Sequence, residues 1–197
     1  MRYHYLDGGV VPELPEVEIM AENARRWSQG RVLVDVEVRD HRIRAGQIDP
    51  RELNGAVFGQ AYRRGKYLVL PLGERAMVFH FRMTGKLVPF EPGRRARLLL
   101  HLPERSLAFV DSRCLGQVWV LSVMDLEAFF VGRRLGPEPF PEQRDGAWWC
   151  AVMQGLTGPL KNSLMRQDRV AGLGNIAASE VCWRAQLHPE VPTHELS

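Results

Sequence analysis

Short apolar runs separated by glycine and proline fill residues 32–120, and they constrain the fold more than any other feature of the chain. The valines of residues 32–38 occupy every second position, which is typical of a strand with one buried face. Further strands are predicted at 57–58, 67–70, 76–81, 97–102, 106–110 and 117–120. Strands of this length and spacing favour an antiparallel β-sandwich.

Helical spacing precedes and follows these strands. Apolar residues recur every three or four positions from Val17 to Trp27. Pro15 suits the first turn of such a helix, and Gly30 suits its end. Beyond residue 121 the same spacing predicts helices at 125–131, 146–154, 160–167 and 176–186.

The predicted fold class is therefore α+β, with the strands first and the helices after them. An N-terminal extension is expected at 1–11, with Gly8 and Gly9 as a flexible joint, followed by a β-sandwich domain at 12–134. A segment rich in proline and glycine, 135–145, is predicted to link it to a helical domain at 146–197.

Composition narrows the class of protein only modestly. The 197 residues are 45% apolar and 25% charged, as in ordinary globular proteins. Because no apolar run reaches about 18 residues and residues 1–10 lack an apolar stretch, we expect neither a membrane span nor a secretory signal. Three widely spaced cysteines argue against a disulfide framework and for a reducing compartment. The net charge of +3 is weak evidence for nucleic-acid binding.

The segment Pro12-Glu-Leu-Pro-Glu-Val-Glu18 carries the first candidate chemistry. Taken alone, it is typical of a capped helix start. If Pro12 is the chain terminus, its secondary amine is partly neutral near pH 7 and can act as a nucleophile. The adjacent Glu13 carboxylate could then move protons.

Four more motifs follow in order along the chain. They are Arg63-Arg-Gly-Lys66, His80-Phe-Arg-Met-Thr-Gly85, Asp111-Ser-Arg-Cys-Leu-Gly116 and Val170-Ala-Gly-Leu-Gly-Asn-Ile176, and Lys161 lies 14 residues before Asn175. Singly, these motifs are also typical of a solvated turn, a core methionine, a surface ion pair and a turn before a helix.

Together and in this order, the five motifs resemble formamidopyrimidine-DNA glycosylase, a family that excises oxidised purines from DNA. The resemblance covers residues 12–197. It implies a catalytic β-sandwich followed by a partial helix–two-turn–helix domain, and a glycosylase with AP-lyase activity on 8-oxoguanine and formamidopyrimidines. The opening motif favours this oxidised-purine branch over the related endonuclease VIII branch.

The resemblance also implies a role for each matching residue. Pro12 corresponds to the nucleophile that attacks the sugar, and Glu13 to the group that shuttles protons. Lys66 corresponds to the hairpin lysine that approaches the DNA beside the lesion.

Five further residues correspond to DNA contacts. Met83, Arg113 and Leu115 match the side chains that fill the space left when the damaged base leaves the stack. Lys161 and Asn175 match residues that hold phosphates beside the lesion.

Several positions depart from the family pattern. Arg82 replaces a glycine, Leu115 a phenylalanine and Ala177 a tyrosine. In the family the proline is the first residue of the mature protein, whereas eleven residues precede Pro12 here. Because the valine codon GTG also initiates translation, we hypothesise that translation begins at Val11 and that methionine removal exposes the Pro12 amine.

The family's zinc finger is built from two Cys-x-x-Cys pairs and would follow Ser197. Cys114, Cys150 and Cys182 cannot form it. We therefore expect no metal and no cofactor, and a chain truncated before the finger or naturally without one, with weak affinity for DNA.

Two alternatives to an active enzyme stay open: a catalytically silent relative that binds damaged DNA, and a truncated gene product. The expected partner is double-stranded DNA containing oxidised bases or abasic sites. We expect a monomer in the bacterial cytoplasm, associated with the nucleoid and not with a membrane.

Overall fold

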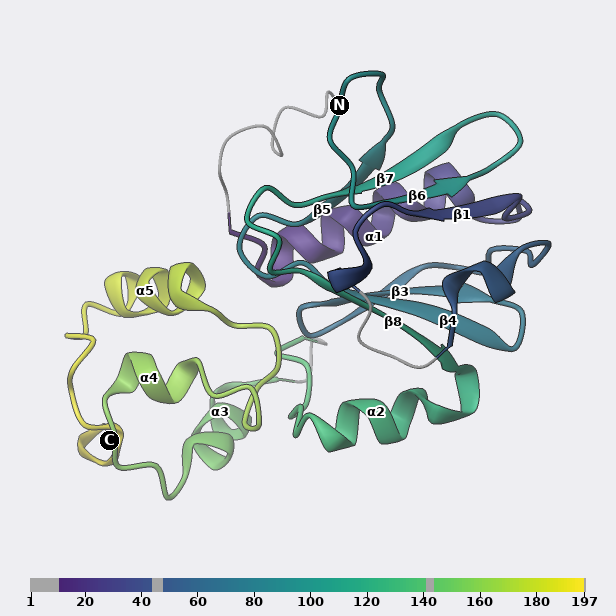
Figure 1. Cartoon of the computed structure of the whole chain (residues 1–197). Coiled ribbons are helices and arrows are strands. Elements are labelled where there is room, and N and C mark those ends of the chain that lie inside the picture. The colour runs from purple at the N-terminus through teal and green to yellow at the C-terminus, as the bar shows by residue number, and fades with distance from the viewer. Residues whose placement is uncertain (1–10, 44–47, 141–143, 197) are drawn as a thin grey trace. The chain divides into compact units, whose positions relative to one another are not determined.

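The structure is a computed structural model that describes residues 11–43, 48–140 and 144–196. The chain divides into two compact units, residues 1–127 and 128–197 (Figure 1). Among the described residues, no helix is both long and apolar enough to cross a membrane.

Two four-stranded antiparallel sheets form the first unit, which confirms the predicted α+β class with a β-sandwich. One sheet has the order β1-β6-β7-β5, with bounds Asp35–Val38, Leu98–His101, Ser106–Val110 and Lys86–Pro89. The other has the order β2-β3-β4-β8, with bounds Tyr62–Arg64, Tyr67–Leu72, Arg75–His80 and Gln117–Ser122. Buried side chains from both sheets belong to a single apolar cluster, so the sheets pack face to face.

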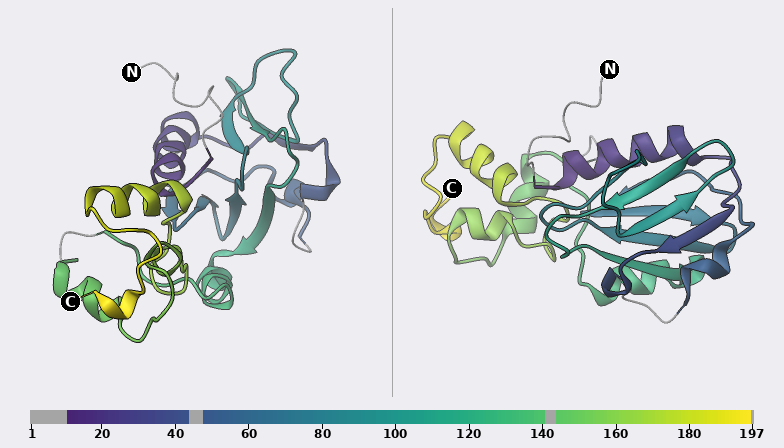
Figure 2. Two further views of the ribbon diagram at one scale, coloured as in Figure 1. Left: turned by 90° about the vertical axis from the view of Figure 1, so that its left-hand side faces the viewer. Right: turned by 45° about the horizontal axis from the view of Figure 1, so that its top comes forward.

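The first helix, α1 (Leu14–Ser28), closes one edge of this sandwich. It contacts β2 and β5, the terminal strands of the two sheets, and also β3. Figure 2 shows α1 running along the stacked sheets. The predicted apolar stripe is buried, since Val17, Met20 and Ala24 are fully inaccessible to solvent. This anchoring fixes where the residues just before α1 lie.

Several strand predictions need correction. The predicted strand at 32–38 begins only at Asp35, and residues 57–58 form isolated bridges, Val32 to Val57 and Phe58 to Leu72. Val32 and Val34 are 40% and 53% exposed, so the alternation of valines marks a buried face only within β1, where Val36 is 2% exposed. Strands β2 and β5 were not predicted, because arginines dominate the first and a proline ends the second.

Short helical segments join the strands or follow them. The 3₁₀ turns η2, η3 and η4 span His41–Ile43, Pro50–Leu53 and Val123–Asp125, and α2 spans Leu126–Gly132.

The second unit contains α3 (Gly146–Met153), α4 (Leu160–Leu164), α5 (Asn175–Arg184) and η5 (Thr193–Glu195). Its small core joins α4 to α5 and comprises Leu160, Leu164, Ala178 and Cys182. The predicted helix at 160–167 ends early, because the side chain of Gln167 bonds to the backbone of Gly172 and Leu173 and holds an irregular connection. Helix α5 begins at Asn175, one residue before the predicted start, and Gly174 is its N-cap.

Candidate functional site

The start of α1 holds two of the predicted catalytic residues. Pro12 is buried, and Glu13 is only 4% exposed. The backbone N–H of Glu13 donates a hydrogen bond of 2.9 Å to the carboxylate of Glu16, as in a capping box. The local sequence therefore builds a rigid helix start in which the backbone just after Pro12 is fixed.

Lys66 lies in the tight turn between β2 and β3 and is half-buried. Burial lowers the pKa of its ammonium group, and the negative charge of Glu13 partly opposes that shift. Glu13 and Lys66 are thus close enough to interact electrostatically. Arg63 fastens the same turn to α1, because its guanidinium bonds to Glu18 at 2.9 Å and to the carbonyl of Gly65 at 3.1 Å.

Met83 lies in the loop between β4 and β5. Its side chain is 39% exposed, so it does not belong to the core. Gly85 donates a backbone hydrogen bond to Phe81 across this loop, and a Cβ atom at Gly85 would lie 2.5 Å from the carbonyl oxygen of Phe81. Arg82 adopts φ = 56°, in the left-handed region that glycine favours. The loop is therefore tightly folded, with Met83 at its surface.

Arg113 and Leu115 lie in the loop between β7 and β8. Both are exposed, Leu115 to 46%. Among the residues that the structure describes, Arg113 has no ion-pair partner. It therefore does not form the surface ion pair that was the alternative to a DNA contact. Cys114 between them has φ = 55°. This loop also presents its side chains outward from a constrained backbone.

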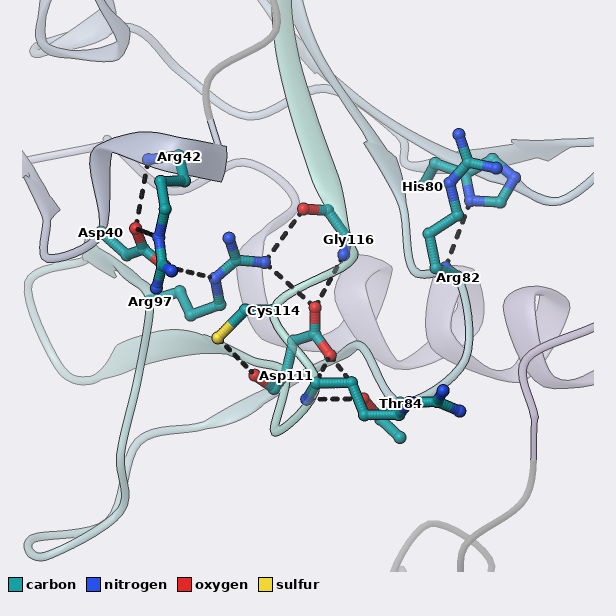
Figure 3. A network of polar contacts seen from close by, with 10 residues as sticks. Asp40, Arg42, His80, Arg82, Thr84, Arg97, Asp111, Cys114 and Gly116 are labelled. Carbon is teal, nitrogen blue, oxygen red and sulfur yellow. Dashed lines mark hydrogen bonds and ion pairs between the residues drawn. The ribbon is translucent and has the colours of Figure 1, made fainter.

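A buried ion pair underlies both loops (Figure 3). The Arg97 guanidinium bonds through Nη1 to the Asp111 carboxylate and to the carbonyl of Gly116, each at 3.0 Å, and through Nε to Asp40 at 3.0 Å. The side chains of Arg97 and Asp111 are 5% and 0% exposed. Asp40 also pairs with Arg42, and that hydrogen bond is the main cause of a strongly lowered pKa for Asp40.

The carboxyl group of Asp111 is ionised despite its burial. Burial alone would raise its pKa, but hydrogen bonds from Thr84 and Gly116 and the charge of Arg97 together lower the pKa below its usual value of 3.8. The negative charge at this position is therefore a stable part of the folded unit.

A pocket of about 570 Å³ opens between these elements of the first unit. Its wall runs from Pro12 and Glu16 past Met83 to Arg95 and Arg97. Its lining is mixed in charge, because the carboxylates of Glu16, Asp40 and Asp111 line it together with four guanidinium groups: Arg39, Arg42, Arg95 and Arg97. A cavity of this size accommodates a nucleobase-sized group.

The second unit holds the other two predicted DNA contacts. Lys161 is half-buried in the first turn of α4, and Asn175 is the exposed first residue of α5. The two helices pack together, which holds both residues on one small body. The structure thus places six predicted site residues in the first unit and these two in the second.

Sequence reasoning missed two residues that organise the site. Thr84 and Arg97 make its central polar contacts, yet neither was assigned a role. An arginine at the edge of an otherwise apolar run, Ala96 to Leu100, is the one signal that could have indicated a buried partner. In the part of the chain that the structure describes, no cluster of His, Cys, Asp or Glu could hold a metal ion.

Comparison with known proteins identifies the family. Residues 11–118 match the formamidopyrimidine-DNA glycosylase N-terminal domain, and residues 135–197 match the H2TH domain of the same family. The chain is 34% identical over 194 residues to formamidopyrimidine-DNA glycosylase of Streptococcus pneumoniae strain R6, covering 95% of this chain and 71% of that protein. It is 35% identical over 196 residues to the enzyme of Gloeobacter violaceus, covering 92% and 69%.

Solved structures agree with this assignment. A Lactococcus lactis Fpg complex with DNA containing an abasic site superposes with a TM-score of 0.86 at 30% identity, covering 94% of this chain and 72% of that one. A complex of the same enzyme with DNA containing an oxidised pyrimidine gives a TM-score of 0.87, with coverage of 94% and 73%. The chain therefore belongs to the formamidopyrimidine-DNA glycosylase family, enzymes of DNA repair that remove oxidised bases from DNA.

Proposed function

We propose that this protein excises oxidised purines, 8-oxoguanine and formamidopyrimidines, from duplex DNA and then cleaves the strand as an AP lyase. The observation that carries the proposal is the pocket that Pro12, Glu16 and Met83 line together. Pro12, whose nitrogen is a secondary amine only when it is the chain terminus, lines this pocket with the carboxylate-bearing Glu16 and the partly exposed Met83. These are the groups that nucleophilic excision of an extruded base requires.

Pro12 acts as the nucleophile once its nitrogen is a free amine. The nitrogen forms a bond to C1′ of the sugar while the bond from C1′ to the base breaks, and the base leaves with that electron pair and a proton. Opening of the sugar gives an iminium ion, which acidifies the C2′ proton. Removal of this proton expels the 3′ phosphate, and water then releases the Pro12 amine.

Glu13 and Lys66 assist this chemistry. Glu13 is buried, next in sequence to Pro12, so its carboxyl group can pass a proton to the opening sugar oxygen. Lys66 interacts electrostatically with Glu13 and carries a point charge that suits a phosphate beside the lesion.

The remaining site residues bind the DNA around the lesion. Extruding a base costs a few kcal/mol, which inserted side chains offset. The exposed positions of Met83, Arg113 and Leu115 support this role. Lys161 and Asn175, at the starts of two packed helices, suit phosphate contacts.

An alternative is a protein that binds damaged DNA without cutting it. The observation that favours it is the peptide bond from Val11 to Pro12, because an amide nitrogen has no basic lone pair. Release of Pro12 as a chain terminus is therefore a necessary part of the proposal. The hypothesis of translation from Val11 provides one route to it.

Borohydride trapping tests the proposal. The native protein, incubated with an 8-oxoguanine duplex and sodium borohydride, should form a covalent adduct whose peptide map places the DNA on the nitrogen of Pro12. Pro15→Ala is the matched control, since it changes an exposed proline of the same segment and should trap like the wild type. An adduct on any other residue, or strand cleavage by protein whose N-terminus is Met1 or Arg2, would refute the mechanism.

A further inference from the structure

The two loops that expose Met83, Arg113 and Leu115 are bonded to each other. We call residues 81–85 and 111–116 the insertion loops. The hydroxyl of Thr84 in the first loop donates a hydrogen bond to Asp111 in the second (Figure 3). The backbone N–H of Arg113 donates to the same hydroxyl oxygen at 3.2 Å. A single threonine side chain therefore joins the loops directly.

The buried side chain of Asp111 holds the backbone of the second loop. Its carboxylate accepts hydrogen bonds from the backbone N–H groups of Gly116 at 2.7 Å and Arg113 at 3.3 Å, so it spans the whole loop. Arg97 bonds to the same carboxylate and to the carbonyl of Gly116. Because Asp111 and Arg97 are both almost completely buried, water does not compete for these bonds.

The backbone of both loops has little freedom to adjust. A Cβ atom at Gly116 would lie 2.6 Å from the ring of Phe109, and Gly85 is equally confined. Arg82 and Cys114 are held in left-handed conformations next to the exposed side chains. Non-glycine residues persist in that region only when surrounding contacts enforce it. The polar contacts of Thr84 and Asp111 are contacts of this kind.

We propose that Thr84 and Asp111 are positioning residues that lock the insertion loops into one rigid wedge before DNA binds. The wedge presents Met83, Arg113 and Leu115 together, so that extrusion of the damaged base does not require the loops to be ordered at that moment. This inference rests on the proposed function. It assigns to Thr84 a role in one step of that function, the opening of the base stack.

Thr84→Val is the decisive variant, because valine has the shape of threonine and lacks the hydroxyl. Thr84→Ser should restore the contact. Thr157→Val is the matched control, since Thr157 is exposed in the second unit. The first measurement is stopped-flow fluorescence with 2-aminopurine beside 8-oxoguanine, which reports unstacking without any chemistry. A hydrogen bond to an ionised group corresponds to a rate change of about ten-fold, so Thr84→Val should slow the fluorescence rise by about ten-fold.

The second measurement compares single-turnover strand cleavage on two duplexes. On 8-oxoguanine, Thr84→Val should be about ten-fold slower than the wild type, as expected for a lost hydrogen bond to a carboxylate. On a preformed abasic site, where no base has to be extruded, its rate should change by less than about two-fold, well below that hydrogen-bond effect. A threonine that merely supported the fold would reduce both rates equally.

The outcomes separate this inference from the proposed function. A wild-type protein that unstacks the duplex without cutting it would refute the glycosylase proposal. The fluorescence rates of the wild type and Thr84→Val would then test by themselves whether Thr84 positions the loops. Equal losses on both duplexes, or an unchanged fluorescence rate in Thr84→Val, would overturn the wedge. A wild type that gives neither fluorescence rise nor cleavage would overturn both proposals.

Discussion

Replacing Arg97 by methionine should destabilise the first unit severely. Methionine keeps the length of the arginine stem but loses the guanidinium group, whose central carbon lies 5.8 Å from the centroid of the Phe109 ring. It removes the cation that pairs with the inaccessible carboxylate of Asp111. The charge of Asp40 is less affected by the substitution, because its carboxylate still accepts hydrogen bonds from Arg42.

The size of the effect follows from burial. Removing one partner of a buried ion pair costs about 3–5 kcal/mol, because the other charge remains desolvated. For a chain of this size each kcal/mol shifts the melting temperature by about 2–4 °C, so Arg97→Met should melt about 6–20 °C lower than the wild type. Arg75→Met is the matched control, since Arg75 also joins two elements but is 38% exposed and faces a half-exposed Glu52. It should cost about 0–1 kcal/mol.

A double-mutant cycle measured by urea denaturation completes the test. Asp111→Asn removes the charge that Arg97 neutralises, so in the Arg97→Met background it should cost less than in the wild type. The expected interaction energy is about 1–3 kcal/mol. A cost of Arg97→Met no greater than that of Arg75→Met would contradict this expectation, and so would single changes at Arg97 and Asp111 that add to within about 0.5 kcal/mol.

Four other predictions concern the same unit. Gly85→Ala should cost about 1–3 kcal/mol in urea denaturation, because its Cβ would meet the carbonyl of Phe81 and force the loop to move. Met83→Ala should slow excision of 8-oxoguanine in a gel assay while changing the melting temperature by less than about 2 °C, because the side chain is partly exposed. The pKa of Asp111 is lowered below 3.8, so the ionised carboxylate contributes its full stabilisation above that pH. This contribution is lost as the pH falls through the folded-state pKa. In acid titrations, Asp111→Asn should therefore show a flatter dependence of stability on pH below about 4. Arg82→Gly should relieve a left-handed conformation at little net cost in stability, and a smaller salt dependence of DNA binding, by about one unit of slope, would show that Arg82 contacts a phosphate.

The fold could be predicted where burial is periodic. The three- and four-residue spacing from Val17 to Trp27 predicted α1, since one helix face meets the sandwich along its whole length. Alternation did not predict burial at Val34, which is 53% exposed and precedes β1. Strand β5 escaped prediction, because Pro89 ends it and proline argues against strands.

The site could be predicted only where a motif carries it. Short motifs indicated Met83 and Arg113, and both lie on exposed loops. The contact that joins those loops could not be found in this way, because Thr84, Asp111 and Arg97 come from three separate segments and meet only in the folded unit. Periodicity reports which face of an element is buried, and it contains no information about pairs of polar side chains across elements.

Several features of the first unit that cost folding free energy lie in or next to the insertion loops. A buried ion pair, two left-handed residues other than glycine and two closely confined glycines lie within or directly beneath them. Each of these features stabilises a fold little or opposes it. Their common effect is stiffness, and a wedge can open a base stack only if it deforms less than the stack that it displaces. It follows that a substitution which relieves backbone strain in these loops, as Arg82→Gly does, should slow extrusion of the base at little net cost in stability.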